Sequence, residues 1–448
     1  MGQPAKTSET SALVTAVFRA WHAAAVPFLV LRNYERLPEE TGNDIDVLVQ
    51  PFDRPLAEAT LRAAASEAGF QLANRGEFAT LALYFASPAT GAQVHFDLFT
   101  DLKWRGFDFL DCGPFLGARV ARGDFAVPHP AQEAATNLLA YFIFTGRVKE
   151  KYRAGIAAAF QACPEEAREI IGRTYGHRLA EELVEAGAAA DWNRIERRLG
   201  TLRRELFLRQ ALLSPARAAA SFLRDAARVL RRAWHPPGMT VILCGTDGSG
   251  KSTAARGLIE GLQGTFSLPK GRQFHWKPPV FSGSRQAARG LVSDPHGRPP
   301  RPLPTSLAFF ALHWLEFLLG WPRRILPATF RGGLVLIDRY YFDFLVDQRR
   351  YRLRVPDWLV RLGYRLLPKP DLVLLFDAPV AVLQARKQEL TREETGRQRE
   401  AFLALVRSLP NGRVIDASLP ADQVAAEAVR AVLDHLTARA AGHPTISR

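Results

Sequence analysis

TVILCGTDGSGKST, residues 240–253, is the stretch on which the fold of this chain depends. Its first five residues are apolar and predict a buried strand, and the spacing G-x-x-x-x-G-K-S follows in the remainder. Glycines let backbone N–H groups surround a phosphate, and the next helix directs its positive N-terminal end at the same point. We therefore predict a strand, a phosphate-binding loop and a helix that together bind a nucleotide.

The residue types in this loop suggest roles for its side chains. Lys251 can place its charge at the terminal phosphates, and the Ser252 hydroxyl can bind Mg²⁺. The predicted nucleotide-binding residues are Gly245, Thr246, Asp247, Gly248, Ser249, Gly250, Lys251, Ser252 and Thr253.

A second landmark is GGLVLIDRYY, residues 332–341. An apolar strand that ends in Asp338 can place a carboxylate beside Mg²⁺, and Arg339 can bind a second phosphate with its forked guanidinium. Beyond the next apolar strand, residues 370–377, the chain contains several arginines in a polar stretch. We predict that they close over the transferring phosphate as a lid, with a solvated helix face as the alternative. These are Arg386, Arg392 and Arg397.

Between these landmarks we predict a helix that runs to about Gln263 and an apolar helix at 307–319, with an insertion between the two. Residues 267–305 are rich in Pro, Arg and Gly and contain the segment Phe274-His275-Trp276-Lys277. Basic and aromatic side chains of this kind suit an anionic acceptor that contains a ring. A disordered loop is the alternative for this insertion.

Residues 240–436 resemble the thymidylate kinase family, within the nucleoside monophosphate kinase-like P-loop fold. The matching pieces are GTDGSGKST, IDRYYFD, PDLVLLFDAP and the Arg-rich stretch, in the family's order. The resemblance implies a parallel sheet with flanking helices, ATP and Mg²⁺ as cofactors, and Asp247 near the acceptor. It implies phosphoryl transfer to dTMP or another small, phosphorylated acceptor.

Two departures from that family concern the acceptor. The family usually has Glu before the first loop glycine, where this chain has Cys244. The family's R-E-P-G-G-T acceptor loop is also missing, and the 267–305 insertion occupies that region. Because phosphoryl transfer depends mainly on positioning and charge neutralisation, the acceptor pocket can change while the ATP machinery stays.

The N-terminal part contains a different constellation, in which Asp44 and Asp46 open one apolar run and Asp97 belongs to a later one. Residues two apart in a strand face the same side, so these carboxylates can bind one Mg²⁺ ion. Residues 26–99 thus resemble the nucleotidyltransferase fold, although that family's Gly-Ser turn is replaced by residues 32–35, Arg-Asn-Tyr-Glu. Nucleotidyl transfer by this part is an alternative function.

The predicted fold class is α/β, with a parallel C-terminal sheet after a small α+β domain and a helical region. We place the nucleotidyltransferase-like domain at 11–127, the helical region at 128–234, the linker HPPG at 235–238 and the P-loop domain at 239–438. The alternation of strands and helices after the linker is the basis for the parallel sheet.

Composition limits the partners and the compartment. Against 45 acidic residues stand 59 basic ones, for a net charge of +14. This charge leaves a nucleotide-gated nucleic-acid-binding protein as a third hypothesis, although arginines spread over the whole chain do not favour it. Three scattered cysteines exclude a disulfide framework, and with a polar N-terminus they predict a cytoplasmic protein. The apolar segment 307–321 is too short to span a membrane, and the family resemblance suggests a homodimer.

Overall fold

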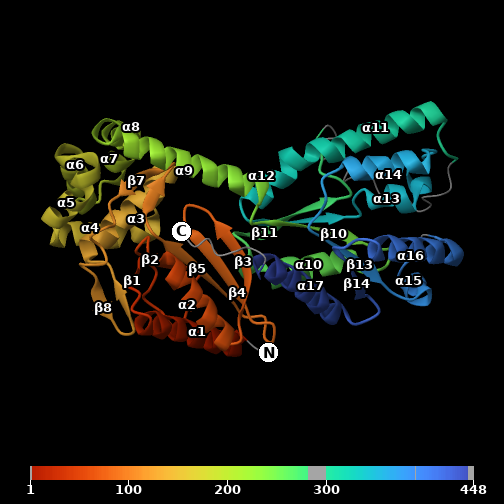
Figure 1. Ribbon diagram of the computed structural model, residues 1–448, viewed down its shortest axis with the longest axis horizontal. Coiled ribbons are helices and arrows are strands. Elements are labelled where there is room, and N and C mark those ends of the chain that lie inside the picture. Colours follow the sequence, from red (N-terminus) through yellow and green to blue (C-terminus); the bar gives the residue numbers. More distant parts are fainter. Residues whose placement is uncertain (1–2, 281–298, 389, 442–448) are drawn as a thin grey trace. The chain divides into compact units, whose positions relative to one another are not determined.

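The computed structural model describes residues 3–280, 299–388 and 390–441. These residues form two compact units, of which the first ends at Arg232 and the second begins at Ala233. Each unit contains a five-stranded sheet of its own (Figure 1).

The sheet of the first unit is mixed. Its strand order is β1-β2-β5-β4-β3, in which only the central pair β2 and β5 is parallel. Along β5 the buried side chains alternate with half-buried ones, so Phe96 points into the core while His95 and Asp97 share the other face. The strands are β1 (Phe28–Val30), β2 (Ile45–Val49), β3 (Gln71–Glu77), β4 (Leu81–Ala86) and β5 (Gln93–Phe99).

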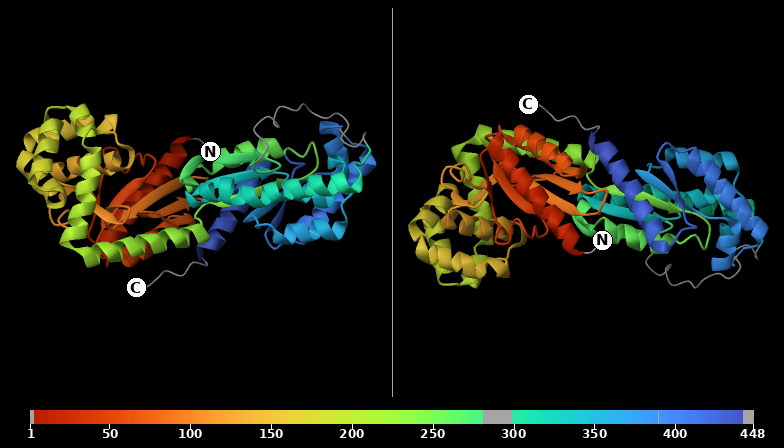
Figure 2. Two further views of the ribbon diagram at one scale, coloured as in Figure 1. Left: turned by 90° about the horizontal axis from the view of Figure 1, so that it is seen from above. Right: turned by 90° about the horizontal axis from the view of Figure 1, so that it is seen from below.

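Two helices lie together beside this sheet, as the red and orange-red ribbons of Figure 2 show. They are α1 (Gln3–Ala23) and α2 (Arg54–Glu67). The buried Trp21 indole joins them by donating from Nε1 to the carbonyl of Ala57 at 2.9 Å. Two short hairpins follow the sheet, β6 (Leu102–Trp104) with β7 (Phe107–Leu110) and β8 (Val120–Arg122) with β9 (Phe125–Val127).

The rest of the first unit is helical and shares one hydrophobic core with the sheet, in which Leu29 and Leu48 pack with Phe142 and Phe160. The Arg-rich end of the helical region forms two helices that are divided at Ser214, because Pro215 has no N–H to continue the hydrogen-bond ladder. The helices are α3 (Pro130–Thr145), α4 (Glu150–Ala162), α5 (Pro164–Tyr175), α6 (His177–Ala188), α7 (Trp192–Glu196), α8 (Leu199–Leu213) and α9 (Pro215–Trp234).

The sheet of the second unit is entirely parallel, with the order β11-β12-β10-β13-β14. The predicted α/β class with a parallel C-terminal sheet is therefore confirmed. The apolar run after the HPPG segment forms the central strand, in which all six residues are buried. The strands are β10 (Met239–Cys244), β11 (Leu268–His275), β12 (Gly333–Asp338), β13 (Leu372–Asp377) and β14 (Gly412–Asp416).

Helices cover both faces of this parallel sheet (Figure 1). On one face Val241 and Leu243 pack with α10 and α17, and on the other Ile242 and Cys244 pack with α11, α13, α14 and α16. Burial on both faces explains why β10 is apolar without alternation. The helices are α10 (Lys251–Gly261), α11 (Leu303–Gly320), α12 (Leu326–Phe330), α13 (Phe342–Val346), α14 (Asp357–Leu366), α15 (Val380–Arg386), α16 (Arg392–Arg407) and α17 (Ala421–Ala441).

Two segments differ from their sequence-based interpretation. The first part of the 267–305 insertion is not a loop, because residues 268–275 form the edge strand β11 beside β12; residues 281–298 lie outside the described part. The apolar helix is longer than 307–321, since a π-helical turn at Trp321–Ile325 continues α11 into α12. By length and composition this Leu303–Phe330 helix could cross a membrane, and 33% of its most apolar window is buried. The same profile fits a core helix, and His313 and Glu316 on it are buried.

Candidate active site

The loop between β10 and α10 has the backbone geometry that its glycines predict. Gly245 has a φ of +138°, and a Cβ at this position would lie 2.6 Å from the carbonyl oxygen of Phe376. Gly248 has a φ of +85°, and its Cβ would lie 2.9 Å from the carbonyl oxygen of Leu383. Any larger residue would therefore displace the loop, which explains why glycine occupies both positions.

Lys251 is the first residue of α10 and its side chain folds back into the loop. Its Nζ donates to the carbonyls of Gly245 at 2.9 Å and Thr246 at 2.8 Å, and to Ser249 Oγ at 3.3 Å. Burial lowers the pKa of the Lys251 ammonium, because the charged form loses its hydration. The positive charge thus lies inside the loop.

The other loop residues differ in exposure. Thr246 and Ser249 are buried, whereas Ser252 and Thr253 are exposed on the first turn of α10. Gly250 precedes the helix in the left-handed conformation, with a φ of +81°. The hydroxyl of Ser252 is therefore accessible to an ion at the N-terminal end of α10.

Asp338 ends β12, the strand that pairs with β10 at Leu243. Its Oδ2 is 3.0 Å from His275 Nδ1, while its Oδ1 is buried without a hydrogen-bond partner among the described residues. Burial alone would raise the pKa of the Asp338 carboxyl, but the His275 bond and the charge of Lys251 outweigh it and lower that pKa. An ionised carboxylate with an uncommitted buried oxygen is a suitable Mg²⁺ ligand, so the residues present fit the ion that the sequence predicts.

The structure gathers a group of alternating charges beside Asp338. Arg339 pairs with Asp247 of the loop, and its Nη1 lies 3.3 Å from Asp343 Oδ2. Arg350 reaches the same loop acid, with 2.9 Å between its Nη1 and Asp247 Oδ2. Tyr351 donates its hydroxyl to Asp343 Oδ2 at 2.7 Å. Asp247 therefore connects the phosphate-binding loop to two arginines.

These contacts fix the ionisation of the group. Burial would raise the pKa of the Asp247 carboxyl, but Arg339 and Arg350 hold it well below its usual range. Burial likewise opposes the charge of Arg339, yet Asp343 and Asp247 raise the pKa of its guanidinium. Arg339 has a φ of 78° and Tyr340 a φ of 56°. Two successive non-glycine residues in the left-handed region are strained, and such strain is concentrated at functional sites.

We call this region the phosphate site: the loop 245–253 with Asp338, Arg339, Asp343 and Arg350. Sequence analysis named Asp338 and Arg339 but missed Asp343 and Arg350. The i,i+4 spacing from Arg339 to Asp343 was a usable signal. Arg350 offered none, because only the turn after α13 brings it back to Asp247.

The aromatic segment of the insertion lies directly against the phosphate site. The backbone N–H of Trp276 donates to the carbonyl of Asp338 at 2.7 Å. The Trp276 ring stacks on Tyr351, with centroids 4.6 Å apart and planes 12° apart, and lies 4.9 Å from the ring of His313. Behind it Lys277 forms a buried ion pair with Glu316. The predicted acceptor segment is thus adjacent to the predicted Mg²⁺ ligand.

The three arginines predicted for the lid lie at the ends and on the surface of α15 and α16. Arg386 ends α15 and donates to the carbonyl of Ala417 at 2.7 Å. Arg392 begins α16 and is exposed. Arg397 pairs with Glu394 at 2.6 Å. Their role over the phosphate site stays a prediction.

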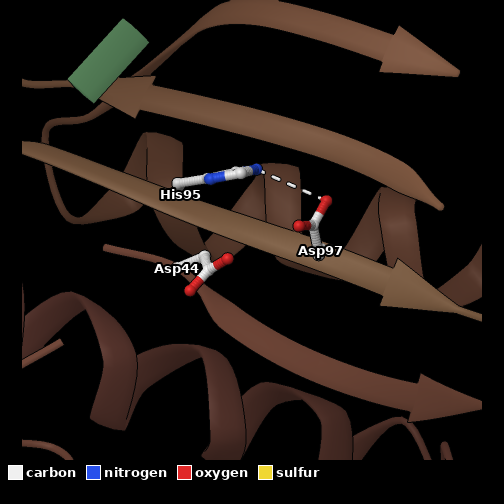
Figure 3. Close-up of side chains that lie close together, drawn as sticks. All are labelled: Asp44, His95 and Asp97. Carbon is white, nitrogen blue, oxygen red and sulfur yellow. Dashed lines mark ion pairs between the residues drawn. The ribbon is translucent and has the colours of Figure 1, made fainter. Parts of the chain in front are cut away.

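The N-terminal acids gather on one face of the first unit's sheet, which we call the acidic face: Asp44, Asp46, His95 and Asp97. Asp44, His95 and Asp97 offer ligand atoms that all lie within 4.8 Å of one another (Figure 3). Asp46 pairs with Asp97 in the β2–β5 register, but its carboxylate is buried in an ion pair with Arg32. The structure thus groups Asp44 and Asp97 with His95, which sequence analysis missed although the H-x-D spacing on a strand was a signal.

Burial also changes the ionisation of the Asp46 carboxyl. Burial raises its pKa to about 6, against the lowering effect of the Arg32 guanidinium. The negative charges of Asp44 and Asp97 raise it further. Asp46 therefore holds its proton more readily than an ordinary aspartic acid does.

Comparison with known proteins concerns the second unit. The family model described as thymidylate kinase matches residues 243–428. A thymidylate kinase of Xylella fastidiosa (strain M12) is 30% identical over 217 residues, which are 46% of this chain and 91% of that protein. A thymidylate kinase of Xanthomonas campestris pv. campestris (strain B100) is 30% identical over 218 residues, 46% of this chain and 87% of that protein. One from Xanthomonas euvesicatoria pv. vesicatoria is 28% identical over 221 residues, with 46% and 88% covered.

The matched residues include the phosphate-binding loop from Leu243 onward, Asp338 and Arg339. They begin well after the acidic face, so the nucleotidyltransferase resemblance of the first unit stays a prediction.

Proposed function

The chain belongs to the thymidylate kinase family, and from that membership we propose that it transfers the terminal phosphoryl group of ATP, with Mg²⁺, to dTMP or another small phosphorylated acceptor. The observation that carries the proposal is the position of Asp247, which joins the phosphate-binding loop to Arg339 and Arg350. Donor and acceptor phosphates can therefore both reach cations of one site.

On the donor side, the phosphate-binding loop and Lys251 bind the phosphates of ATP. The loop glycines leave space for a phosphate close to the backbone, and α10 points its N-terminal end there. The Lys251 ammonium moves from the loop carbonyls to the phosphate oxygens and neutralises their charge. Asp338 Oδ1 and the Ser252 hydroxyl are the groups that would hold Mg²⁺, which neutralises charge on the transferring phosphoryl group when bound.

On the acceptor side the two arginines bind the phosphate of the acceptor. Arg339 is held by Asp247 and Asp343, so its guanidinium is already oriented and loses little rotational freedom on binding. An acceptor phosphate competes with Asp247 for Arg350 and Arg339, which frees the loop acid to face the acceptor. The ring of the acceptor lies toward Trp276, whose backbone N–H donates to the carbonyl of Asp338.

The test is ADP release by the full chain with ATP and Mg²⁺, over dTMP, other nucleoside monophosphates and sugar phosphates. We expect acceptor-dependent ADP release that Lys251→Ala lowers by about 10²–10³-fold or more, because a charge that stabilises the transition state is lost. Lys369→Ala is the matched control, since Lys369 is an exposed lysine of the same unit, and it should leave the rate unchanged. ADP release that survives Lys251→Ala would show that the proposal is wrong.

A second candidate, nucleotidyl transfer by the first unit, rests on the grouping of Asp44 with Asp97. It predicts pyrophosphate release from a nucleoside triphosphate that Asp97→Asn abolishes and Lys251→Ala does not. The ion pair of Asp46 with Arg32 weighs against it, because it occupies one of the three predicted acids. Absence of pyrophosphate with every nucleoside triphosphate would exclude it.

A further inference from the structure

The acidic face contains three side chains whose ligand atoms converge without a cation among them. Asp44 immediately precedes β2, and His95 and Asp97 lie two apart on β5, the parallel neighbour of β2. Residues two apart in a strand share a face, so the register itself brings these side chains together. Figure 3 shows the three side chains directed into the same space.

The contact between His95 and Asp97 has the dimensions of a ligand pair around a metal. His95 Nε2 lies 3.4 Å from Asp97 Oδ1, and it has no hydrogen-bond partner within the described chain. The two atoms can form an ion pair when the imidazole is protonated, and a metal ion between them can take the place of that proton. Two ligand atoms at about 2.0–2.1 Å from a tetrahedral ion are themselves about 3.4 Å apart.

Both side chains are held in place by neighbouring side chains. The His95 ring stacks on Tyr84 across the β4–β5 pair, with centroids 4.0 Å apart and planes 16° apart. Thr80 donates its hydroxyl to Asp97 Oδ1 at 2.9 Å. Contacts of this kind orient metal ligands and fix their rotamers. Asp44 is only half-buried, so its carboxylate can rotate the remaining distance toward the other two.

Asp46 is not available as a ligand in the same way. Its side chain is 1% exposed and its Oδ2 is bound by Arg32. Its Oδ1 has no hydrogen-bond partner among the described residues, but Asp46 does not belong to the group whose ligand atoms lie within 4.8 Å of one another. The converging set is therefore two carboxylates and one imidazole.

We propose that Asp44, His95 and Asp97 bind one divalent transition-metal ion, of the class that accepts mixed nitrogen and oxygen ligands, such as Zn²⁺ or Mn²⁺. Mg²⁺ prefers oxygen ligands and retains water, so an imidazole in the set selects against it. Three protein ligands leave at least one coordination position open to water or to a substrate. A cavity of about 200 Å³ adjoins the site through Arg32 and Thr80 and also has Lys103 in its wall. Arg32 is paired with Asp46 and Lys103 with Asp101, which also lines the cavity, so an anionic ligand there would compete with these carboxylates.

The experiment is titration of the full chain with Zn²⁺, Mn²⁺ or Mg²⁺ by calorimetry, after removal of metals with a chelator and without nucleotide. We expect one site per chain for Zn²⁺, at least about 100-fold tighter than for Mg²⁺. His95→Ala and Asp97→Asn should each weaken Zn²⁺ binding by about 100-fold. Asp46→Asn is the discriminating control, and it should change Zn²⁺ affinity by less than about 10-fold.

Two further measurements keep the proposal falsifiable if a variant unfolds. Circular dichroism on heating establishes whether each variant is folded. His95→Asp converts the set to oxygen ligands alone, so it should lower the preference for Zn²⁺ over Mg²⁺ in a folded protein. The proposal is overturned if Zn²⁺ does not bind, if His95→Ala binds it normally, or if Asp46→Asn abolishes binding as an all-acid Mg²⁺ site requires.

Discussion

The phosphate site and the acidic face are both groups of charged side chains on or beside parallel strands, but they balance their charges differently. In the phosphate site Lys251, Arg339 and Arg350 accompany Asp247, Asp338 and Asp343, and four of these six residues are joined in one chain of ion pairs. Among the described residues of the acidic face, Asp46 pairs with Arg32, and Asp97 lies 3.4 Å from the Nε2 of His95. The first arrangement suits a polyanion that arrives with its own cation, whereas the second attracts a cation.

The two sites also differ in the contacts that fix the positions of their side chains. Arg339 and Asp247 restrain each other, so the phosphate site is ordered by its own charges. His95 and Asp97 are positioned by an uncharged ring and a hydroxyl, Tyr84 and Thr80, which leaves their charges and lone pairs available. The acidic face therefore carries negative charge that a bound cation would balance. The charges of the phosphate site balance one another until a substrate competes for its arginines.

Removing one arginine from each region gives the largest and most direct test of this contrast. Arg339→Ala should lower kcat/KM for phosphoryl transfer by about 10²–10³-fold, because an oriented cation at the transferring phosphate is lost. Arg32→Ala should act in the opposite direction on Zn²⁺ and raise the affinity for it several-fold, because the guanidinium that pairs with Asp46 is removed. Coupled ADP assays and Zn²⁺ calorimetry on the full chain measure the two effects.

Arg339→Lys and Arg32→Lys are the matched controls. Lysine keeps the charge but not the forked geometry, so Arg339→Lys should remain strongly impaired while Arg32→Lys should bind Zn²⁺ nearly as the unmodified chain does. If Arg32→Ala instead loses Zn²⁺ affinity in a folded protein, the guanidinium helps to form the metal site. The two regions would then not differ in the role of their arginines.

Stability at acid pH also tests the comparison, because burial lowers the pKa of His313 and raises the pKa of Asp46. Burial and the nearby Lys277 lower the pKa of His313 to about 4, so this group takes up its proton more readily in the unfolded chain. The second unit therefore loses stability from this group as pH falls from about 6.5 to 4, by up to about 3 kcal/mol. The pKa of Asp46 is raised to about 6, so the folded first unit takes up that proton first and gains stability as pH falls from about 6 to 4.

Hydrogen exchange of the full chain, in the presence of a chelator, resolves the two units at each pH. His313→Asn should flatten the acid response of the helix α11, and Asp46→Asn that of the β2–β5 pair. An unchanged pH response in both variants would show that other groups control the acid stability of the two units.

The parts of the molecule that could be predicted from the sequence are those in which an apolar run and a functional motif lie next to each other in the chain. The loop 245–253 and the strand that ends in Asp338 carry a motif and an apolar run, so their position in a parallel sheet could be predicted. The strand β11 was missed because its residues include proline, lysine and glycine and gain their strand conformation by pairing with β12.

Long-range contacts account for the residues that sequence reasoning missed. Arg350 joins Asp247 across 103 positions of the chain, and Lys277 pairs with Glu316 across 39. The grouping of Asp44, Asp46 and Asp97 was inferred from strand periodicity, which gives the face of a side chain but not its partner. Only the fold shows that Asp46 forms an ion pair with Arg32, and that His95 completes the group of possible metal ligands instead of Asp46.

We expect the smallest effect when a single hydrogen bond to an acidic residue of the phosphate site is removed. Tyr351→Phe removes the hydroxyl that donates to Asp343 Oδ2 at 2.7 Å but keeps the ring stacked on Trp276. A hydrogen bond to a charged group contributes about 1.5–3 kcal/mol, and we expect a loss near the lower end because Arg339 still approaches the same oxygen at 3.3 Å. Chemical denaturation measures the loss, and kcat/KM should fall about 10-fold as Arg339 becomes less restrained.

Tyr340→Phe is the matched control, since the Tyr340 hydroxyl donates at 3.0 Å to the neutral carbonyl of Pro368. A bond to a neutral acceptor contributes about 0.5–1.5 kcal/mol, so this variant should lose less stability and keep its kcat/KM. Equal losses of stability in the two variants, with kcat/KM unchanged in both, would mean that Asp343 does not orient Arg339. The phosphate site would then depend on Asp247 alone, and its internal balance of charges would be weaker than the ion pairs indicate.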